Sequence, residues 1–214
     1  MEESTSREKV LKRVRNALIS KSDIPFPKID FEKQVFIELN ESPDIYFAQE
    51  FTKAGGKFVY CENEGELLET LQILVRERKW DNIFALEQKV IDILKKGNIQ
   101  YISGSENLTS AHVGITNCEY LIARYGSVMV SSGQRSGRRI NVFPEAHVVI
   151  AYTSQLVPDL KDAFIKMRKR YETRIPSMIT VITGPSRTAD IEKTLVMGAH
   201  GPREVYVILV EDRI

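Results

Sequence analysis

The fold is decided by a stretch of two apolar runs, Met178-Ile179-Thr180-Val181-Ile182 and Val205-Tyr206-Val207-Ile208-Leu209-Val210, separated by a turn at Gly184-Pro185 and a glycine-rich segment, Gly198–Arg203. Both runs are short and contain several β-branched residues, which is typical of buried strands. The residues after Gly184 predict a turn and then a short helix. Two strands joined by one helix normally lie parallel and side by side, and open α/β sheets tend to bind ligands beyond the carboxyl ends of such strands. We therefore expect the loops Gly184–Asp190 and Gly198–Arg203 to converge on one crevice.

The composition is that of an ordinary globular protein. The chain has 214 residues, of which 43% are hydrophobic and 28% charged, enough for one α/β domain with a substantial core. Thirty basic and 29 acidic residues give a net charge of +1, so no strong field favours nucleic acid. No apolar run approaches membrane-spanning length, and the polar start of the sequence is unlike a signal peptide. We expect a cytoplasmic protein without a membrane span.

The residues that most often bind metals are few and scattered. The two cysteines, Cys61 and Cys118, cannot by themselves hold an iron–sulfur cluster or a cysteine-based zinc ion, and each is expected to be a buried free thiol. The three histidines, His112, His147 and His200, show no ligand spacing. We expect no metal and no cofactor.

The first 42 residues differ from the rest of the chain. Thr5-Ser6-Arg7-Glu8 is a capping-box pattern that predicts a helix over Ser6–Ser20, with Val10, Leu11, Val14 and Leu18 on one face. Prolines after Ser22 predict a loop or tether. This helix could pack on its own domain or on a second subunit, so a homo-oligomer is left open. We divide the chain into residues 1–42, the helix and tether, and residues 43–214, an α/β domain that should fold alone.

From residue 44 onward, helical and strand patterns alternate. This alternation favours a parallel sheet with helices on its faces. A predicted hairpin then introduces antiparallel pairing, so the expected fold is a three-layer α/β/α sandwich with one mixed, mostly parallel sheet. The expected elements are a helix from Asp44, a strand Lys57–Cys61, a helix capped by Asn63, a strand Asn82–Leu86, a helix Gln88–Lys96, a strand Ile99–Ile102, a hairpin of Cys118–Ala123 and Ser127–Ser131, a strand Ala146–Tyr152 and a helix from Pro158.

The segment after Gly184 has two readings. Ser186 or Thr188 could simply cap the helix. Alternatively, free backbone N–H groups, the two hydroxyls and Arg187 could hold a phosphate or carboxylate. Asp190 would suit the helix dipole but repel such an anion. The residue types alone leave both readings open.

The second loop contains one histidine between glycines. Gly198 and Gly201 let the backbone approach a neighbour closely and leave His200 accessible. His200 could act as a general acid or base or contact an anion, but without an identified partner it more often bonds a loop carbonyl. His200 and Asp190 are the candidate catalytic residues, with no role assigned.

A basic loop, Gly133–Arg139, precedes Pro144 and His147. Its arginines, Arg138 among them, could bind a nucleotide or coenzyme A phosphate, a partner protein or solvent. The loop lacks the aromatic residues of a nucleic-acid platform. Dinucleotide, Walker A, zinc-protease and nucleophile-elbow motifs are all absent from the sequence.

These motifs together resemble the lactate-utilisation protein C family, the LUD domain. The resemblance covers roughly residues 45–210. It implies a fold like that of sugar-phosphate isomerases and coenzyme A transferases. The matching segments are Thr183–Glu192, Gly198-x-His200-Gly201-Pro202, Val113–Thr116, Gly126-Ser127, Gly137-Arg138 and Pro144-x-x-His147.

The resemblance also implies a function. Members are usually encoded with two iron–sulfur proteins, and the three together oxidise L-lactate to pyruvate. This chain would be the member without a cluster, binding partners and a small anionic ligand. The motif positions taken as ligand-binding candidates are Gly184, Ser186, Arg187, Thr188, Gly198, His200, Gly201, Arg138 and His147.

The sequence departs from the family pattern at two places. His112 stands where an acidic residue is expected, and Arg124-Tyr125 stands where a Glu-Thr pair is expected. A carboxylate therefore cannot act at these positions. The alternative function is a stand-alone enzyme for an acyl, coenzyme A or sugar-phosphate substrate, so whether the chain is itself an enzyme is left open.

Overall fold

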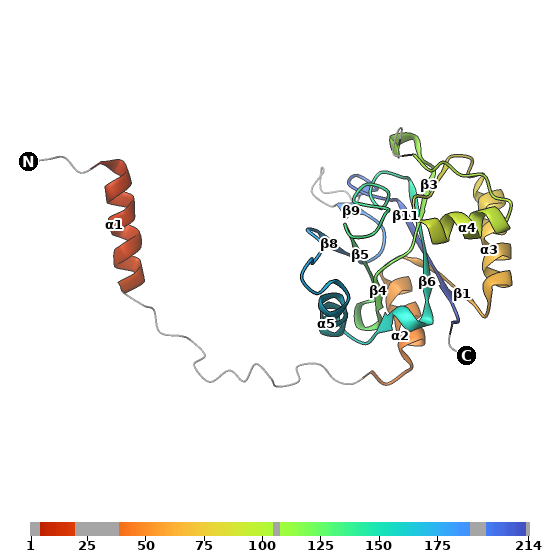
Figure 1. Ribbon diagram of the computed structural model, residues 1–214, viewed down its shortest axis with the longest axis horizontal. Helices are drawn as coiled ribbons and strands as arrows, with labels where there is room; N and C mark the ends of the chain where they lie inside the picture. The colour runs from red at the N-terminus through yellow and green to blue at the C-terminus, as the bar shows by residue number, and fades with distance from the viewer. Residues whose placement is uncertain (1–4, 20–38, 105–107, 189–195, 213–214) are drawn as a thin grey trace, which may run out of the picture. The chain divides into compact units, whose positions relative to one another are not determined.

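The computed structural model describes residues 5–19, 39–104, 108–188 and 196–212. The chain forms two units, residues 1–38 and 39–214, which are treated separately below. In the first unit, α1 spans Ser6–Ile19, close to the predicted range (Figure 1). The predicted capping box is confirmed, because the Thr5 N–H donates to Glu8 Oε2 at 2.8 Å and the Glu8 N–H donates to Thr5 Oγ1 at 3.3 Å. The predicted tether falls mostly on residues 20–38, outside the described part of the chain.

The second unit contains the remaining helices and strands. They are α2 (Pro43–Lys53), β1 (Lys57–Cys61), α3 (Glu64–Arg78), β2 (Ile83–Phe84), α4 (Gln88–Lys96), η1 (Leu108–Ser110), β3 (Val113–Thr116), β4 (Tyr120–Ile122), η2 (Ala123–Tyr125), β5 (Ser127–Ser131), β6 (Ala146–Tyr152), η3 (Thr153–Gln155), β7 (Leu156–Val157), α5 (Leu160–Tyr171), β8 (Ile179–Ile182), β9 (Arg187–Thr188), β10 (Val196–Met197) and β11 (Glu204–Val210).

The strands form two main sheets and not the single mixed sheet that we expected. The first has five parallel strands in the order β1-β11-β6-β3-β2. The second has four strands in the order β7-β4-β5-β8, in which only β4 and β7 pair in parallel. The α/β class and the parallel sheet are confirmed, whereas the three-layer arrangement is wrong. The pattern of alternation could not reveal this, because a predicted hairpin is compatible with either sheet.

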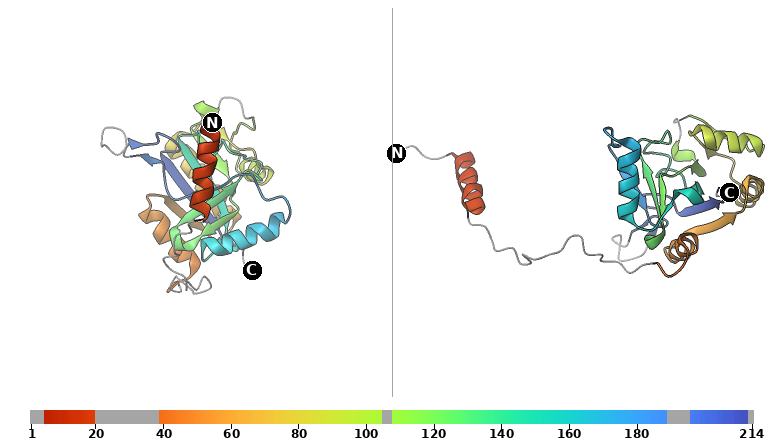
Figure 2. Two further views of the ribbon diagram at one scale, coloured as in Figure 1. Left: turned by 90° about the vertical axis from the view of Figure 1, so that its left-hand side faces the viewer. Right: turned by 60° about the horizontal axis from the view of Figure 1, so that its bottom comes forward.

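Three apolar clusters show how the layers stack. The first cluster joins α3 and α4 to one face of the parallel sheet. The second cluster fills the space between the two sheets and includes Phe47 and Phe51 of α2. The third cluster joins the outer face of the second sheet to Ala163 and Met167 of α5. Helices α3 and α4 therefore lie on the opposite side of the two sheets from α5, as Figures 1 and 2 show.

Several local predictions are confirmed. Asn63 accepts a hydrogen bond from the Glu66 N–H at 3.0 Å and so begins α3 as expected. The hairpin of β4 and β5 is antiparallel, and α4 has the predicted bounds. The predicted strand Ile99–Ile102 is reduced to one bridge between Ile102 and Phe84. Within the described residues, no helix is long and apolar enough to cross a membrane.

Candidate functional site

The two motif loops, defined here as residues 183–188 and 196–203, contact each other directly. The Ser186 N–H donates to the Pro202 carbonyl, and the Gly198 N–H donates to the Ser186 carbonyl, each at 2.9 Å. The His200 N–H lies 3.4 Å from Ser186 Oγ. The expected convergence of these two loops is therefore present in the structure.

The route by which the loops meet differs from the prediction. The strands that flank them are β8 and β11, which we expected to be neighbours, but these lie in different sheets. Residues Arg187–Thr188 and Val196–Met197 pair as antiparallel strands, β9 and β10, where we expected the start of a helix after Gly184. The described residues Gly184–Thr188 therefore contain no helix start. Ala189, Asp190 and the five residues that follow lie outside the described residues.

The motif glycines have a structural explanation. Gly184 has φ +73°, and a Cβ atom at this position would lie 2.3 Å from the Ala54 carbonyl oxygen. Gly198 has φ +77°, and a Cβ atom there would lie 2.2 Å from Cγ of Arg203. Both positions therefore combine left-handed backbone with a close approach that only glycine permits.

The polar side chains of the motif loops lie at the surface. Arg187 and His200 are exposed, and Ser186 and Thr188 are half-buried. No carboxylate among the described residues lies within ion-pair distance of Arg187. Its guanidinium, which lies close to Gly55, can therefore donate hydrogen bonds to an anion.

Another of the motifs from the sequence analysis, Gly126-Ser127, lies beside these loops. The hydroxyls of Ser127 and Thr183 are 2.7 Å apart, so Gly126-Ser127 adjoins the first motif loop. Both residues line a depression of about 420 Å³ that also includes Arg124. Arg124 Nε donates to Asp159 Oδ2 at 2.7 Å, and both side chains are mostly buried. The departure from the family pattern at Arg124 is thus matched by a carboxylate supplied by the start of α5.

The remaining ligand-binding candidates lie elsewhere. Arg138 is exposed and donates to Ser177 Oγ at 2.6 Å. His147 is fully buried, and its Nε2 lies 2.8 Å from Thr116 Oγ1. Burial lowers the pKa of His147 to about 4, which keeps the ring neutral at physiological pH. We expected His147 among the ligand-binding residues, and its ring is fully buried against Thr116.

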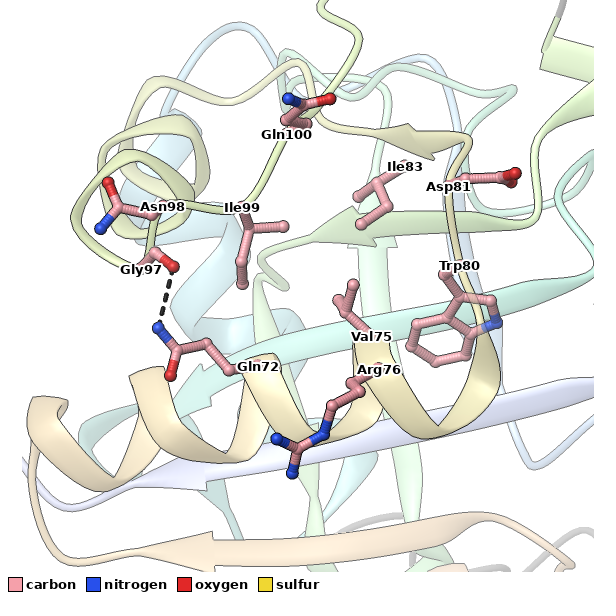
Figure 3. Close-up of a pocket in the computed structure, with 10 residues that line it drawn as sticks. All are labelled: Gln72, Val75, Arg76, Trp80, Asp81, Ile83, Gly97, Asn98, Ile99 and Gln100. Atoms are coloured by element: carbon pink, nitrogen blue, oxygen red, sulfur yellow. Dashed lines mark hydrogen bonds between the residues drawn. The ribbon is translucent and has the colours of Figure 1, made fainter.

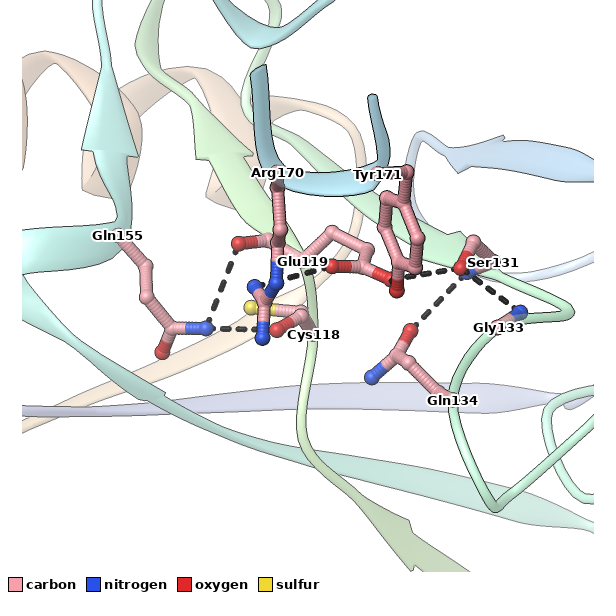
Figure 4. A network of polar contacts seen from close by, with 8 residues as sticks. All are labelled: Cys118, Glu119, Ser131, Gly133, Gln134, Gln155, Arg170 and Tyr171. Carbon is pink, nitrogen blue, oxygen red and sulfur yellow. Dashed lines mark hydrogen bonds and ion pairs between the residues drawn. The ribbon is translucent and has the colours of Figure 1, made fainter. Parts of the chain in front are cut away.

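A buried carboxylate that our sequence analysis missed anchors the basic loop. Glu119 Oε1 accepts from Ser131 Oγ and from the Tyr171 hydroxyl, each at 2.6 Å, and Glu119 Oε2 lies 3.1 Å from Arg170 (Figure 4). Gln134 Oε1 accepts from the Ser131 N–H at 3.0 Å. The network ties α5 to the end of β5 and fixes where the loop begins. The apolar run around Glu119 gave no sign of its partners, which come from distant parts of the chain.

A depression of about 480 Å³ is lined by none of the candidate residues. It lies at the amino edge of the parallel sheet, where Trp80 and Asp81 lead into β2 (Figure 3). Gln72 Nε2 donates to the Gly97 carbonyl at 2.9 Å across it. Open α/β sheets bind ligands at the opposite edge, so this depression does not favour a substrate site.

Both cysteines are buried free thiols, as expected. Burial, followed by the carboxylates Glu119 and Glu87, raises the pKa of the Cys118 thiol well above its ordinary value. Burial also raises the pKa of Cys61. Neither thiol is a reactive nucleophile at neutral pH. Among the described residues, no group of three or more histidines, cysteines or carboxylates could hold a metal ion.

Comparison with known proteins shows which protein family this chain resembles. The pattern of the LUD domain matches residues 46–210. Two proteins named "Lactate utilization protein C" are similar: one from Halalkalibacterium halodurans is 38% identical over 110 residues, and one from Bacillus subtilis is 39% identical over 115 residues. These matches cover 50% and 51% of this chain and 48% of each relative, so the match spans about half the length of the relatives.

A solved structure is similar in fold. A crystal structure of a DUF162 family protein from Deinococcus radiodurans superposes with a TM-score of 0.59, covering 78% of this chain and 96% of that chain. The two sequences are 15% identical, so this likeness concerns the fold alone.

Proposed function

This chain belongs to the LUD domain family, and from that premise we propose that it is a subunit of an L-lactate utilisation system and carries no iron–sulfur cluster itself. The observation that carries the proposal is the family match over residues 46–210, together with relatives that are named for lactate utilisation. The proposed partners are iron–sulfur proteins that perform the electron transfer in the oxidation of lactate to pyruvate.

The cysteine content supports the division of labour. The chain contains two cysteines, whereas an iron–sulfur cluster normally needs four thiolate ligands. Both thiols are buried and have raised pKa values, so they are poor ligands for a shared cluster as well. Electrons would then pass through the partner proteins, and this chain would bind those partners and a small anionic ligand.

We further propose that the motif loops bind a small anionic ligand. The exposed Arg187 supplies a permanent positive charge, and Ser186 and His200 belong to the same two loops, which contact each other. A carboxylate or phosphate at this place would gain charge-assisted hydrogen bonds without a rearrangement of the core. Asp190, which lies outside the described residues, would either orient His200 or Arg187 or only favour the start of a helix.

The test is growth on L-lactate. In a strain that lacks the gene for this chain, we expect growth on L-lactate to fail and growth on pyruvate to continue. The unaltered gene should restore growth on L-lactate, and Arg187→Ala and His200→Ala should restore it poorly. Because both side chains are exposed, their removal should change the melting temperature very little. Arg174→Ala, at another exposed arginine, is the matched control and should restore growth fully.

Several results would contradict the proposal. Normal growth of the deletion strain on L-lactate would remove the role in lactate utilisation. Turnover of lactate by the purified chain alone, with an artificial electron acceptor, would instead indicate a stand-alone enzyme. Full growth with both motif-loop variants would remove the ligand role of these loops and leave the subunit role intact.

A further inference from the structure

One outer strand of the second sheet has an edge without the usual protection. Strand β8 lies at one end of the order β7-β4-β5-β8, and within the described residues it pairs only with β5 (Figure 1). Natural proteins normally protect such edges with charged residues, with proline, or by making the strand very short. Strand β8 has four residues, and none of them is charged or a proline. Its free edge can therefore pair with another strand.

The other edge strands of the two main sheets do have such protection. Strands β2 and β7 contain only two residues each. Strand β1 begins with the charged Lys57, whose ammonium lies 2.6 Å from Glu204 Oε1. Among the edge strands that the structure describes in these two sheets, β8 is thus the one that is neither very short nor charged.

The hydrogen-bond phase of β8 identifies which of its backbone groups are free. In an antiparallel pair, residues that exchange both N–H···O bonds with the partner strand alternate with residues whose N–H and C=O point away from it. The Ser132 N–H donates to the Met178 carbonyl at 2.9 Å, so these two residues, just before β8, form a hydrogen-bonded pair. Thr180 and Ile182 follow Met178 in steps of two, so their backbone groups face β5.

The N–H and C=O groups of the alternate residues, Ile179 and Val181, therefore point to the free edge. The β5 residues opposite them agree with this phase. The Ser131 N–H, opposite Ile179, donates to a side chain of the following loop at 3.0 Å. The Met129 carbonyl, opposite Val181, accepts from the Glu119 N–H at 2.8 Å. Two donors and two acceptors thus face outward, and none of them has a partner among the described residues.

These four groups match those of a second copy of β8. When two copies run antiparallel about a two-fold axis at Thr180, Ile179 of each copy faces Val181 of the other in a hydrogen-bonded pair. All four free groups of each copy then have partners. The Val181 side chain, which is 41% exposed, meets an isoleucine of the second copy, and the two Thr180 side chains form a favourable cross-strand pair.

The charges near the strand also suit a second copy. The residues on either side of β8, Ser177-Met178 and Thr183-Gly184, are uncharged, so this pairing brings no like charges together. A two-fold interface needs only one surface that matches itself, and the phase of β8 provides such a match. A strand of another protein would have to supply the same pattern independently.

We infer that β8 is the dimer interface of this chain, and that two copies join their second sheets edge to edge with Thr180 at the two-fold axis. The two four-stranded sheets then form one continuous sheet, with the α5 helix of each copy on the same face. The inference does not depend on the proposed role in lactate utilisation.

The first test measures the oligomeric state of the purified full-length chain. Sedimentation equilibrium should show a dimer that dissociates on dilution. In hydrogen exchange, the amides of Ile179 and Val181 should be protected in the dimer and lose this protection as the dimer dissociates. The amides of Thr180 and Ile182, which face β5, should be protected at every concentration.

A charged variant tests the edge directly. Val181→Lys should weaken dimerisation about tenfold or more, because natural proteins use charged side chains at strand edges to prevent such pairing. Since Val181 is 41% exposed, the variant should fold and keep the circular dichroism spectrum of the unaltered chain. Ile73→Lys, on α3 and 43% exposed, is the matched control and should dimerise like the unaltered chain.

Cysteine variants test the register. Thr180→Cys places two thiols opposite each other in a pair whose Cα atoms are about 4.5 Å apart, within the range of a disulfide, so mild oxidation should cross-link the dimer. Val181→Cys, at the next residue, is the control, because its two copies are diagonal neighbours with Cβ atoms about 7–8 Å apart, too far for a disulfide. The natural cysteines, Cys61 and Cys118, are buried and should not react.

Three outcomes would overturn the inference. One is a chain that stays monomeric at every concentration, and protection of the Val181 amide only after addition of another protein would then make β8 a site for a foreign strand. Another is an equal effect of Val181→Lys and Ile73→Lys on a dimer. The third is a failure of Thr180→Cys to cross-link more readily than Val181→Cys. Because cross-linking requires no charged variant, the test remains decisive even if Val181→Lys is unstable.

Discussion

The motif loops and the protein interior differ in where their polar side chains lie and in whether these side chains are paired. In the motif loops, Ser186 is paired through its backbone, and Arg187 and His200 lie exposed. In the interior, Glu87 and His147 are buried, and each has one polar atom without a partner in the described part of the chain. The loops carry the motifs on which the resemblance to the LUD domain was argued, yet their glycines are explained by backbone packing. The difference teaches that a sequence motif can mark a demanding backbone path, while a buried polar atom without a partner can also belong to a residue, such as Glu87, that lies in none of the motifs.

The largest expected effect tests whether the motif glycines are structural. Gly184→Ala should lower the free energy of unfolding by about 4 kcal/mol or more, because the new Cβ atom would overlap the Ala54 carbonyl in a left-handed backbone. Gly137 has φ +66° and nothing within 4 Å of a Cβ atom, so it is the matched control. Gly137→Ala should cost about 1 kcal/mol, the cost of the left-handed conformation alone.

Urea denaturation of both variants measures these costs. Equal costs at Gly184 and Gly137 would break the comparison, because the close approach to Ala54 would then not explain the motif glycine. Ligand contact would become the better explanation for the signature.

A smaller effect, dependent on pH, tests the buried side of the comparison. His147 has a pKa of about 4 in the folded chain against 6.5 when unperturbed. Between these values the unfolded chain binds more protons than the folded chain, so stability falls as the pH is lowered from about 6.5 to 4. Above pH 6.5, the neutral His147 contributes about 3 kcal/mol to the free energy of unfolding, and this contribution is fully lost below pH 4.

His147→Gln should remove this share, and the free energy of unfolding should then depend less steeply on pH between 4 and 6.5. His200→Gln, at an exposed ring, is the control and should retain the slope of the unaltered chain. An unchanged slope in His147→Gln would mean that the ring is accessible to protons in the folded state, and the contrast between the two regions would weaken.

Local structure could be predicted from the sequence to a large extent. Helix α4 and the Asn63 cap follow from residue types a few positions apart, and the structure confirms both. Strands β3 and β7 and the second sheet were not expected. β7 has only two residues, and the membership of a strand in one sheet or another depends on contacts between distant segments.

The candidate site could be predicted only in part. The sequence motifs led correctly to two loops that contact each other, since Ser186 and Gly198 lie close along the chain. The motifs could not show that His147 is buried or that Glu119 is paired, because the partners Thr116 and Tyr171 lie 31 and 52 positions away. The sequence does not distinguish Glu87 from an ordinary helix cap, because a single carboxylate before a helix usually has only that role.

The smallest effect compares the same substitution in the two regions. Ser131 is buried, donates to Glu119 at 2.6 Å and accepts from the Gly133 N–H at 3.0 Å. Ser131→Ala removes a hydrogen bond to a buried carboxylate, so it should cost about 2 kcal/mol. Ser186 is half-buried, and its hydroxyl has one long contact, 3.4 Å from the His200 N–H. Ser186→Ala should cost no more than about 0.5 kcal/mol, because water can replace that contact.

Thermal and urea unfolding of the two serine variants measure this difference directly. Because both substitutions remove the same hydroxyl, the change in side-chain volume cancels between them, and the difference reports the surroundings. A small cost at Ser186 together with weakened lactate-dependent growth would place its hydroxyl in ligand binding. A cost at Ser186 as large as that at Ser131 would mean that the hydroxyl clasps the two motif loops together. The loops would then have a structural role like that of the Glu119 network. Ligand binding by their exposed side chains would no longer be supported.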